Sequence, residues 1–549
     1  MSLHPVATQS VPIETVRVAR AAFLKGSLAM MIRDELDCVY EDKQFAELYA
    51  QRGQPGWSPW RLALVCILQF AEGLSDRQAA EAARGRIDWK YALGLELDDP
   101  GFDASILTEF RGRLLSTNQG EHLLNQLLEV LKNKGLVAAR TQQRTDSTHI
   151  LGAVRELNRL TMVIETLRQV LNELAVLEAD WLRSVIEPDW FDRYSRRADD
   201  FHLPTARKAR EALALQVGQD GWKVLKAVEA LPVSNPAHQS ERIAILREVW
   251  AQQYNIRPKS IRWRKSKDLP ANGELLVSPE DPEVRSSKKR DEYWVGYKVH
   301  VTETCDAELP HIITHVETMP ATSQDDQALT PIHTALQDKA LLPSQHIVDA
   351  GYTNSFRLAD SQEQFGIDLV GKVSVENNWQ TRTQDAIPLS AFEIDFEHKQ
   401  VTCPAGQQTV SWVITKDIRG QPIIHSTFPR QVCAGCVLRT RCTRSNFHGR
   451  SLGFRPQAQQ QALQAARLRQ GTEEFKAIYA KRAGVEGTLS QAIRRNDLRF
   501  ARYRGMHKTH LQHIFVAAAL NIIRLFDWLE EKPLAKTRKS PFARLAPAT

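Results

Sequence analysis

Three acidic residues lie at positions where their carboxylates could bind metal ions. Asp146 follows a short extended segment, Asp349 ends the apolar run His346-Ile347-Val348, and Glu486 lies in a segment with helical periodicity. Carboxylates at the carboxyl ends of sheet strands face the crevice where α/β folds place their ligands. Mg²⁺ prefers such oxygens and keeps waters that can become nucleophiles. Taken singly, each of the 65 acids is more simply a solvated surface charge.

Four cysteines form a second candidate site. Cys403 is followed by Cys433-Ala-Gly-Cys436 and then by Cys442. A CxxC with two further cysteines offers four thiolates for one tetrahedral Zn²⁺, so these residues predict one structural zinc ion, although their spacing is irregular for a zinc ribbon. Free buried thiols are the alternative, because a disulfide is disfavoured in the cytoplasm. The histidines form no HExxH motif or similar ligand pair, so the sequence predicts no catalytic transition-metal site.

Basic residues gather near the third acid. Between Lys481 and His510, eight Lys or Arg residues face only Glu486 and Asp497, a net charge of +6. Guanidinium groups bind phosphate oxygens in pairs, so this run predicts DNA contact, with a solvated helix face as the alternative. Tyr297 and Lys298, on a strand-like segment, could contact the DNA backbone or pack on an exposed edge. The expected DNA contacts in the basic run are Arg494, Arg495, Arg499, Arg502, Arg504 and Lys508.

The elements that must position these residues belong to a chain of several domains. The chain has 549 residues, 42% of them hydrophobic and 25% charged, with a net charge of +7, which is ordinary for a globular protein. No leader segment is expected at the N-terminus. The most apolar window, Leu62 to Phe70, is too short to span a bilayer, so we expect no membrane partner. The absence of a glycine-rich phosphate loop argues against a P-loop NTPase.

Periodicity changes along the chain from helical to strand-like. Residues 34 to 128 read as helices, with Ser75 as a cap before Arg77, and predict either a helix-turn-helix that reads DNA or a plain helical bundle. Residues 154 to 250 are again helical. From Val295 to Val301 apolar residues alternate, residues 312 to 316 can supply the antiparallel partner, and a helix and a short strand follow. This order predicts a mixed α/β sheet.

Several separate segments, taken in order, resemble a known family. They are Asp146-Ser-Thr148, Trp294-Val-Gly-Tyr-Lys-Val-His300, Val348-Asp-Ala-Gly-Tyr352, Arg482-Ala-Gly-Val-Glu-Gly487 and Arg504-Gly-Met-His-Lys508. The chain resembles the DDE transposases of bacterial insertion sequences, in the broad group of families four and five. Within that group it is most similar to the insertion-sequence family numbered eleven eighty-two. The resemblance covers most of the chain.

The resemblance implies an α/β fold with an RNase H-like core, a mixed sheet with flanking helices. Asp146 would lie on its first strand, Asp349 on the fourth and Glu486 on the following helix, together holding two Mg²⁺ (or Mn²⁺) ions per active site. Tyr479, Arg482 and Glu486 match the group's Tyr-x2-Arg-x3-Glu signature, and Tyr479 and Arg482 are expected to contact DNA. The lysine that usually completes the signature is Ile493 here, with Arg494 and Arg495 beside it.

The expected organisation combines this core with an all-helical N-terminal domain and two insertions, one helical and one a small β region with the cysteines. Its segments are a disordered N-terminus (1–25), a DNA-binding helical domain (26–135), the first core strand (136–154), a helical insertion (155–266), a linker (267–292), the central core (293–394), the Cys-rich insertion (395–450), the C-terminal helices with Glu486 (451–530) and a basic tail (531–549).

The resemblance implies a transposase that cuts DNA at the inverted-repeat ends of its element and joins them to target DNA, acting as a homodimer on the bacterial nucleoid in the cytoplasm. Catalysis would combine metal charge stabilisation with in-line positioning of the phosphodiester. The alternatives are a nuclease of the same fold that does not join strands and a domesticated DNA-binding protein without catalysis.

Overall fold

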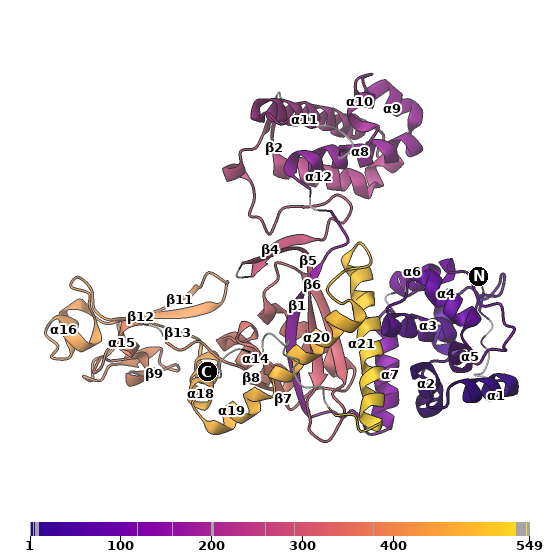
Figure 1. The fold of residues 1–549 in the computed structure, drawn as a ribbon. Helices are drawn as coiled ribbons and strands as arrows, with labels where there is room; N and C mark the ends of the chain where they lie inside the picture. The colour runs from indigo at the N-terminus through magenta and orange to yellow at the C-terminus, as the bar shows by residue number, and fades with distance from the viewer. Residues whose placement is uncertain are drawn as a thin grey trace.

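The computed structural model describes residues 2, 3, 5, 10–117, 119–155, 157–198, 203–258, 260–289, 291–376, 378–533 and 545. Figure 1 shows a central sheet with N-terminal helices on one side, a small β region on the opposite side and a helical region above. The mixed α/β character and the helical N-terminal region agree with the expectation. Among the described residues, no helix combines the length and apolar character that crossing a bilayer requires.

The central sheet has six strands. Its order is β4-β5-β1-β7-β8, and β6 pairs with β5 beside β4. β5 runs antiparallel to β1 and to β6, whereas β7 and β8 run parallel to β1. The expected antiparallel pairing of Val295–Val301 with residues 312 to 316 is therefore confirmed. The strands are β1 (Gln142–Leu151), β4 (Arg285–Lys289), β5 (Glu292–Thr304), β6 (Ile313–Pro320), β7 (Gln345–Val348) and β8 (Asp368–Val370).

The alternation of side chains along β5 explains why this strand is central. Val295, Tyr297, Val299 and Val301 point to one face and are almost fully buried. That face is covered by a helix layer, in which α21 (Met506–Leu529) packs against β6. The other helices around the sheet are α13 (Leu329–Asp338), α14 (Ser355–Phe365), α18 (Gln457–Gln470), α19 (Glu473–Ala480) and α20 (Ala483–Asn496).

Helix α21 also joins the sheet to the N-terminal helices. It packs against α3 and α7, and the rings of Phe70 and Phe515 stack with centroids 5.3 Å apart. One continuous hydrophobic core therefore includes the N-terminal helices and the sheet. The N-terminal helices are α1 (Ile13–Ala22), α2 (Leu28–Leu36), α3 (Pro59–Glu72), α4 (Asp76–Gly85), α5 (Ile87–Leu93), α6 (Ser105–Ser116) and α7 (His122–Asn133).

The local signals expected at these helices are confirmed in part. Ser75 caps α4 in a capping box with Gln78, as its position predicts. Ser58 precedes Pro59 at the start of α3, but its hydroxyl donates to Asp42 instead of capping the helix. The expected disorder of residues 1–25 is wrong for Ile13–Ala22, because Ala19 is fully buried against Met30 and Tyr91.

The helical insertion has a hydrophobic core of its own. It contains α8 (Arg159–Leu177), α9 (Ala179–Val185), α10 (Trp190–Tyr194), α11 (Arg207–Glu229), α12 (Glu241–Gln253), β2 (Tyr254–Arg257) and β3 (Ser260–Trp263). The segment 267–292, expected as a linker, departs from that expectation at its end. Arg285–Lys289 forms β4 because the antiparallel ladder with β5 satisfies its backbone groups.

The cysteine-containing region is a small unit of short strands and helices. Only eight hydrophobic side chains form its buried core. Its elements are α15 (Trp379–Arg382), β9 (Glu393–Asp395), β10 (Gln400–Thr402), β11 (Ser411–Lys416), β12 (Pro422–Thr427), α16 (Arg430–Ala434), α17 (Arg439–Cys442) and β13 (Ser451–Phe454). Most of the basic tail 531–549 lies outside the described residues.

Candidate functional site

The three candidate acids converge on one side of the sheet. Thr145 of β1 pairs with Val348 of β7, so the next residues, Asp146 and Asp349, lie side by side. Glu486 lies in the first turn of α20. All three carboxylates line one open cavity of about 640 Å³. Residues that are 340 positions apart in sequence thus share one solvent-accessible space.

Two residues before α20, Tyr479 at the end of α19 and Arg482 at the N-cap of α20, contact the acids. Arg482 donates to Asp146 Oδ2 over 3.1 Å and to Glu486 Oε1 over 2.6 Å. The hydroxyl of Tyr479 donates to Asp349 Oδ1 over 3.3 Å. Tyr479 and Arg482 between them therefore contact all three acids, which gives the sequence spacing of Tyr479, Arg482 and Glu486 a structural explanation.

The environment of Asp146 differs from that of an ordinary surface acid. Its side chain is only 17% exposed, as is that of Arg482. Burial raises the pKa of Asp146, while the Ser147 amide and Arg482 act in the opposite direction. The neighbouring Asp349 carboxylate adds to the increase in pKa. A nearby cation would therefore favour the ionised form of Asp146.

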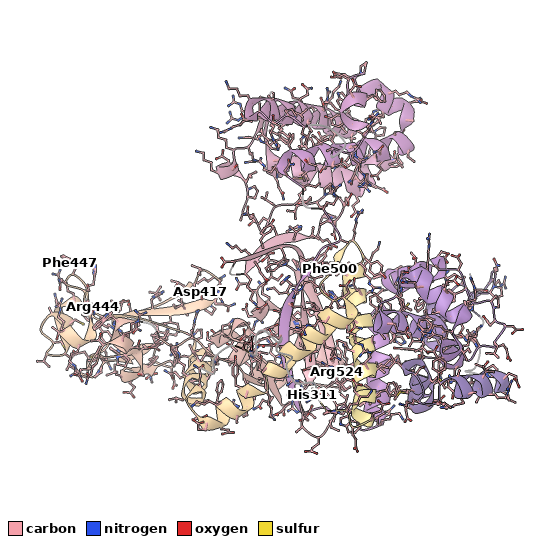
Figure 2. The ribbon with its side chains drawn as sticks, viewed as in Figure 1. His311, Asp417, Arg444, Phe447, Phe500 and Arg524 are labelled. Carbon is pink, nitrogen blue, oxygen red and sulfur yellow. The ribbon has the colours of Figure 1, made fainter. Side chains whose placement is uncertain are left out.

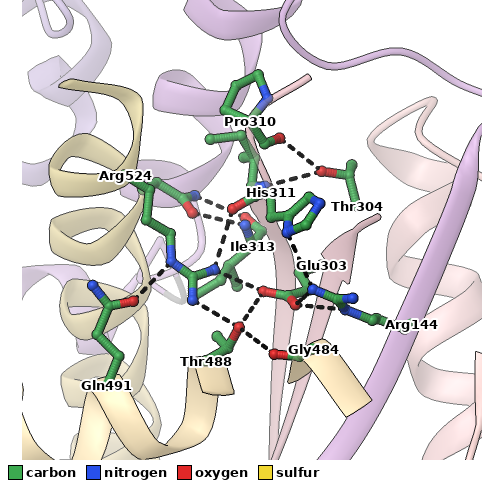
Figure 3. A network of polar contacts seen from close by, with 12 residues as sticks. Arg144, Glu303, Thr304, Pro310, His311, Ile313, Gly484, Thr488, Gln491 and Arg524 are labelled. Atoms are coloured by element: carbon green, nitrogen blue, oxygen red, sulfur yellow. Dashed lines mark hydrogen bonds and ion pairs between the residues drawn. The ribbon is translucent and has the colours of Figure 1, made fainter. Parts of the chain in front are cut away.

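A buried polar network fixes the start of α20 (Figure 3). Glu303 of β5 is 0% exposed and accepts from Arg144 over 2.7 Å and from Arg524 over 2.7 Å. Arg144 also donates to the carbonyl of Lys481 over 2.6 Å. Thr488 donates to Glu303 over 2.6 Å, so the helix is held on both sides of Glu486.

The acid cavity suits a hard divalent cation in its chemistry. Three carboxylates supply the oxygen ligands that Mg²⁺ and Mn²⁺ prefer, and the cavity is wide enough for water. Within the described ranges, however, no group of three or more His, Cys, Asp or Glu side chains is already arranged around a metal position. At the acids, Arg482 instead pairs with one oxygen each of Asp146 and Glu486.

Two of the expected DNA contacts are engaged inside the protein. Tyr297 is fully buried, and its hydroxyl donates to Asp281 over 2.7 Å. The expected contact of Tyr297 with DNA is therefore wrong, because the α21 side of the sheet covers its ring. Lys298 lies on the opposite face, where it pairs with Asp325 over 2.9 Å and donates to Ser323 O over 2.7 Å.

The basic run divides into bonded and free residues. Arg499 donates to the carbonyl of His149 over 2.8 Å, and Arg502 donates to that of Leu74 over 3.0 Å. Arg504 pairs with Glu280 over 2.5 Å. These three arginines join distant segments, so the charge run is partly a set of structural contacts. Arg77, Arg494, Arg495 and Lys508 are exposed, and Arg504 is exposed as well despite its ion pair.

The four cysteines lie together, as their spacing predicts. Cys403, Cys433, Cys436 and Cys442 line one small cavity of about 30 Å³ in the β region. All four are free thiols. Burial raises the pKa of the Cys442 thiol, and the three other thiols are near enough to contribute to this increase.

Other residues at the site carry no signal in the sequence. Lys289 lines the acid cavity, although it falls in a segment that reads as a linker. Glu303 is one acid among 65, and nothing in its sequence neighbourhood distinguishes a buried acid from a solvated one. Partners such as Arg144 and Arg524 are known only once the fold brings them together.

Two family models match separate parts of the chain. The model described as "Transposase DDE domain" matches residues 402–526, which include Glu486 and the four cysteines. The model described as "Transposase domain (DUF772)" matches residues 21–113, in the N-terminal helices. No curated protein matches the chain.

Proposed function

We infer, since two transposase family models match separate parts of the chain, that it is a transposase with a DDE domain, which cuts DNA at the inverted-repeat ends of an insertion sequence and transfers the freed strand to target DNA. The observation that carries this proposal is the convergence of Asp146, Asp349 and Glu486 on one cavity. The sheet order, with β7 and β8 parallel to β1, supports an RNase H-like core. Placement in the family numbered eleven eighty-two is part of the same proposal.

The three acids are proposed to hold two Mg²⁺ (or Mn²⁺) ions. When bound, these ions supply charge neutralisation of the phosphodiester and activation of the attacking oxygen. The protein contributes the placement of the carboxylates on β1, at the end of β7 and on α20. The oxygen of water, and later the freed 3′-hydroxyl, attacks phosphorus while the bond to the leaving oxygen breaks in line.

Arg482 has a proposed double role. In the protein without DNA it pairs with both Asp146 and Glu486 and neutralises their charge. Once those carboxylates have other cationic partners, its guanidinium is available for a DNA phosphate, which it can bind through two oxygens. Tyr479 holds Asp349 in position through its hydroxyl.

DNA is the proposed partner, both as terminal repeats and as target. The exposed residues Arg494, Arg495 and Lys508 lie on or after α20 and are proposed to contact phosphates. Arg77, exposed on α4, is proposed to contact the element's ends. Two such sites must act on the two ends of an element, so we propose a homodimer in the DNA complex, at work on the bacterial nucleoid in the cytoplasm.

One structural Zn²⁺ is proposed for the cysteine-containing region. Four thiols line one cavity there, and the buried hydrophobic core beside them has only eight members. Small units with so little apolar core commonly depend on a metal or on disulfides. Because all four cysteines are free thiols, a metal is the favoured solution.

The test uses single variants of the acids. Asp146→Asn, Asp349→Asn and Glu486→Gln keep the shape of each side chain but remove the charge that holds a cation. Each is expected to abolish cleavage of a supercoiled plasmid carrying two inverted repeats in Mg²⁺, while gel-shift affinity for the repeats stays largely intact. Substantial cleavage by any one variant would remove that residue from the site.

Two further readouts separate the alternatives. Joining of a pre-cut end to target DNA distinguishes a transposase from a nuclease that does not transfer strands. Binding without any cleavage by the unaltered protein would identify a domesticated DNA-binding protein.

A further inference from the structure

The acid cavity adjoins a larger hollow, which in turn adjoins a third one. It shares Ser147 and Lys289 with a hollow of about 980 Å³. That hollow shares Gln324, Gly351 and Arg419 with a third one of about 1210 Å³, which reaches the cysteine-containing region. The three spaces adjoin one another through these shared residues and are together called here the trough, which leads away from the acids.

The trough carries cations without acidic partners. Lys288 and Lys289 of β4, Lys372 after β8, and Arg419 are exposed. Within the described residues, none of the four has a carboxylate at ion-pair distance. Lys372 lies 5.3 Å from the ring of Tyr479, next to the acids. Free cations along a depression favour an anionic partner that runs its length.

Arg419 is held at the edge of the trough by a well-bonded turn. β11 and β12 form a hairpin, and Asp417 at its turn accepts from the amides of Arg419 and Gln421, each over 2.9 Å. Arg455 pairs with the same carboxylate over 2.7 Å. Figure 2 shows Asp417 at the end of the hairpin nearer the central sheet, whereas Arg444 and Phe447 lie at the far end.

The hairpin turn has one more unusual property. Ile418, beside Arg419, is fully exposed, and Val413 and Ile414 on β11 are more than half exposed. Exposed apolar side chains that gather on one element commonly mark a contact surface. Here they adjoin a cation that borders two of the three hollows.

We propose that the trough binds the DNA segment that continues beyond the bond cut at the acids, with its phosphates on Lys288, Lys289, Lys372 and Arg419. This proposal rests on the proposed function, since it assigns a path to the same substrate. DNA fits because its phosphates recur at regular spacing along the backbone and need cations that have no other partner. The segment enters at the acids and leaves beneath the β11–β12 hairpin.

The experiment measures binding with cleavage blocked. Full-length protein carrying Asp349→Asn is titrated, in buffer without divalent cations, with two duplexes. One duplex ends at the cut position, and the other continues into flanking DNA. Lys372→Ala with Arg419→Ala is compared with a control pair, Lys134→Ala with Lys399→Ala, which are exposed lysines outside the trough lining.

The expected result is specific to the flank. The trough variant should lose affinity for the extended duplex only. Its log-log salt slope should flatten by up to about 1.8, at about 0.9 for each phosphate that the protein no longer neutralises. Hydroxyl-radical protection of the flank should disappear with it. The control pair should behave as the parent, and thermal unfolding should be the same for all three proteins.

The proposal would be overturned if the trough variant lost the same affinity for both duplexes, or lost none for the extended duplex. The proposal would also be overturned if flanking DNA added no salt-dependent affinity for the parent protein. That result is expected if the trough binds an acidic protein instead of DNA. Failure of the proposed function looks different: the unaltered protein would not cut DNA, while the flank-specific loss would still be measured here.

Discussion

At the scale of single residues, Glu303 is a buried acid that helps to fix the position of α20. It is fully buried between Arg144 and Arg524, and it also accepts from Thr488. Burial by itself would raise the pKa of Glu303, but the two guanidinium groups outweigh it and hold the pKa below its ordinary value. Glu303 is therefore ionised in the folded protein at neutral pH.

Glu303→Gln should destabilise the protein at pH 7 by roughly 3–5 kcal/mol, because removing one member of a buried ion pair leaves the others uncompensated. Urea unfolding measures this loss. Since the folded pKa is depressed, the carboxylate's contribution is present at neutral pH and is lost as the pH falls through the folded pKa. The difference in the free energy of unfolding between the variant and the parent should therefore become smaller at acidic pH.

A matched change without burial serves as the control for this prediction. Glu308→Gln removes the same charge from an exposed position, so it should leave the free energy of unfolding nearly unchanged. If the Glu303→Gln protein is as stable as the parent at pH 7, the ion pairs of Glu303 with Arg144 and Arg524 contribute no net stability.

At the scale of elements, two glycines of α20 flank Glu486 in different surroundings. A Cβ on Gly484 would lie 2.0 Å from Arg144 Nη1, whereas a Cβ on Gly487 would meet nothing within 4 Å. Gly484→Ala should displace the helix from Arg144 and reduce cleavage strongly. Gly487→Ala should leave cleavage intact and stabilise the helix by roughly 0.5–1 kcal/mol. Plasmid cleavage and thermal unfolding measure both effects.

The two alanine variants check each other. Equal activity of Gly484→Ala and Gly487→Ala would mean that the close approach to Arg144 does not set the position of Glu486. Both variants are expected to bind DNA normally, since neither substitution removes a cation that is proposed to contact DNA.

The cysteine-containing region should bind about one zinc ion per chain, because four thiolates saturate one tetrahedral ion. Cys436→Ser should lose the metal and destabilise mainly residues 395–450, since folding there would be coupled to metal binding. Elemental analysis and hydrogen exchange measure the two effects. Cys38→Ser, outside the cluster, should keep the metal. Fully folded protein without metal would end the proposal.

How much of these elements can be predicted from the sequence depends on how local the signal is. The alternation at Val295–Val301, the run before Asp349 and the cap at Ser75 depend on neighbouring residues, and all three predictions are confirmed. The bonds of Arg499 and Arg502 depend on carbonyls more than 300 residues away. The charge pattern predicts phosphate binding for both arginines, because the sequence does not reveal that distant carbonyl groups accept their hydrogen bonds.

At the scale of the whole molecule, the two helical regions relate differently to the sheet. The helical insertion has a core of its own, whereas the N-terminal helices share one core with the sheet through α21. The sequence predicts a helical N-terminal domain and a helical insertion, and helical periodicity alone does not reveal which of them shares its core with the sheet. Removing residues 1–120 would expose Phe515 and its neighbours, so single substitutions such as Arg77→Ala are the better probe of end recognition.

The distance along the chain between the acids has a consequence for synthesis. Asp146 leaves the ribosome early, and Glu486 follows roughly 20–70 s later at about 5–20 residues per second. Helix α21, which packs on β6, comes later still. A nascent chain therefore has its first acid long before it has the last, and on the proposed function it cannot cut DNA until translation is nearly complete. Interrupted synthesis would leave fragments that hold part of the site and none of its activity.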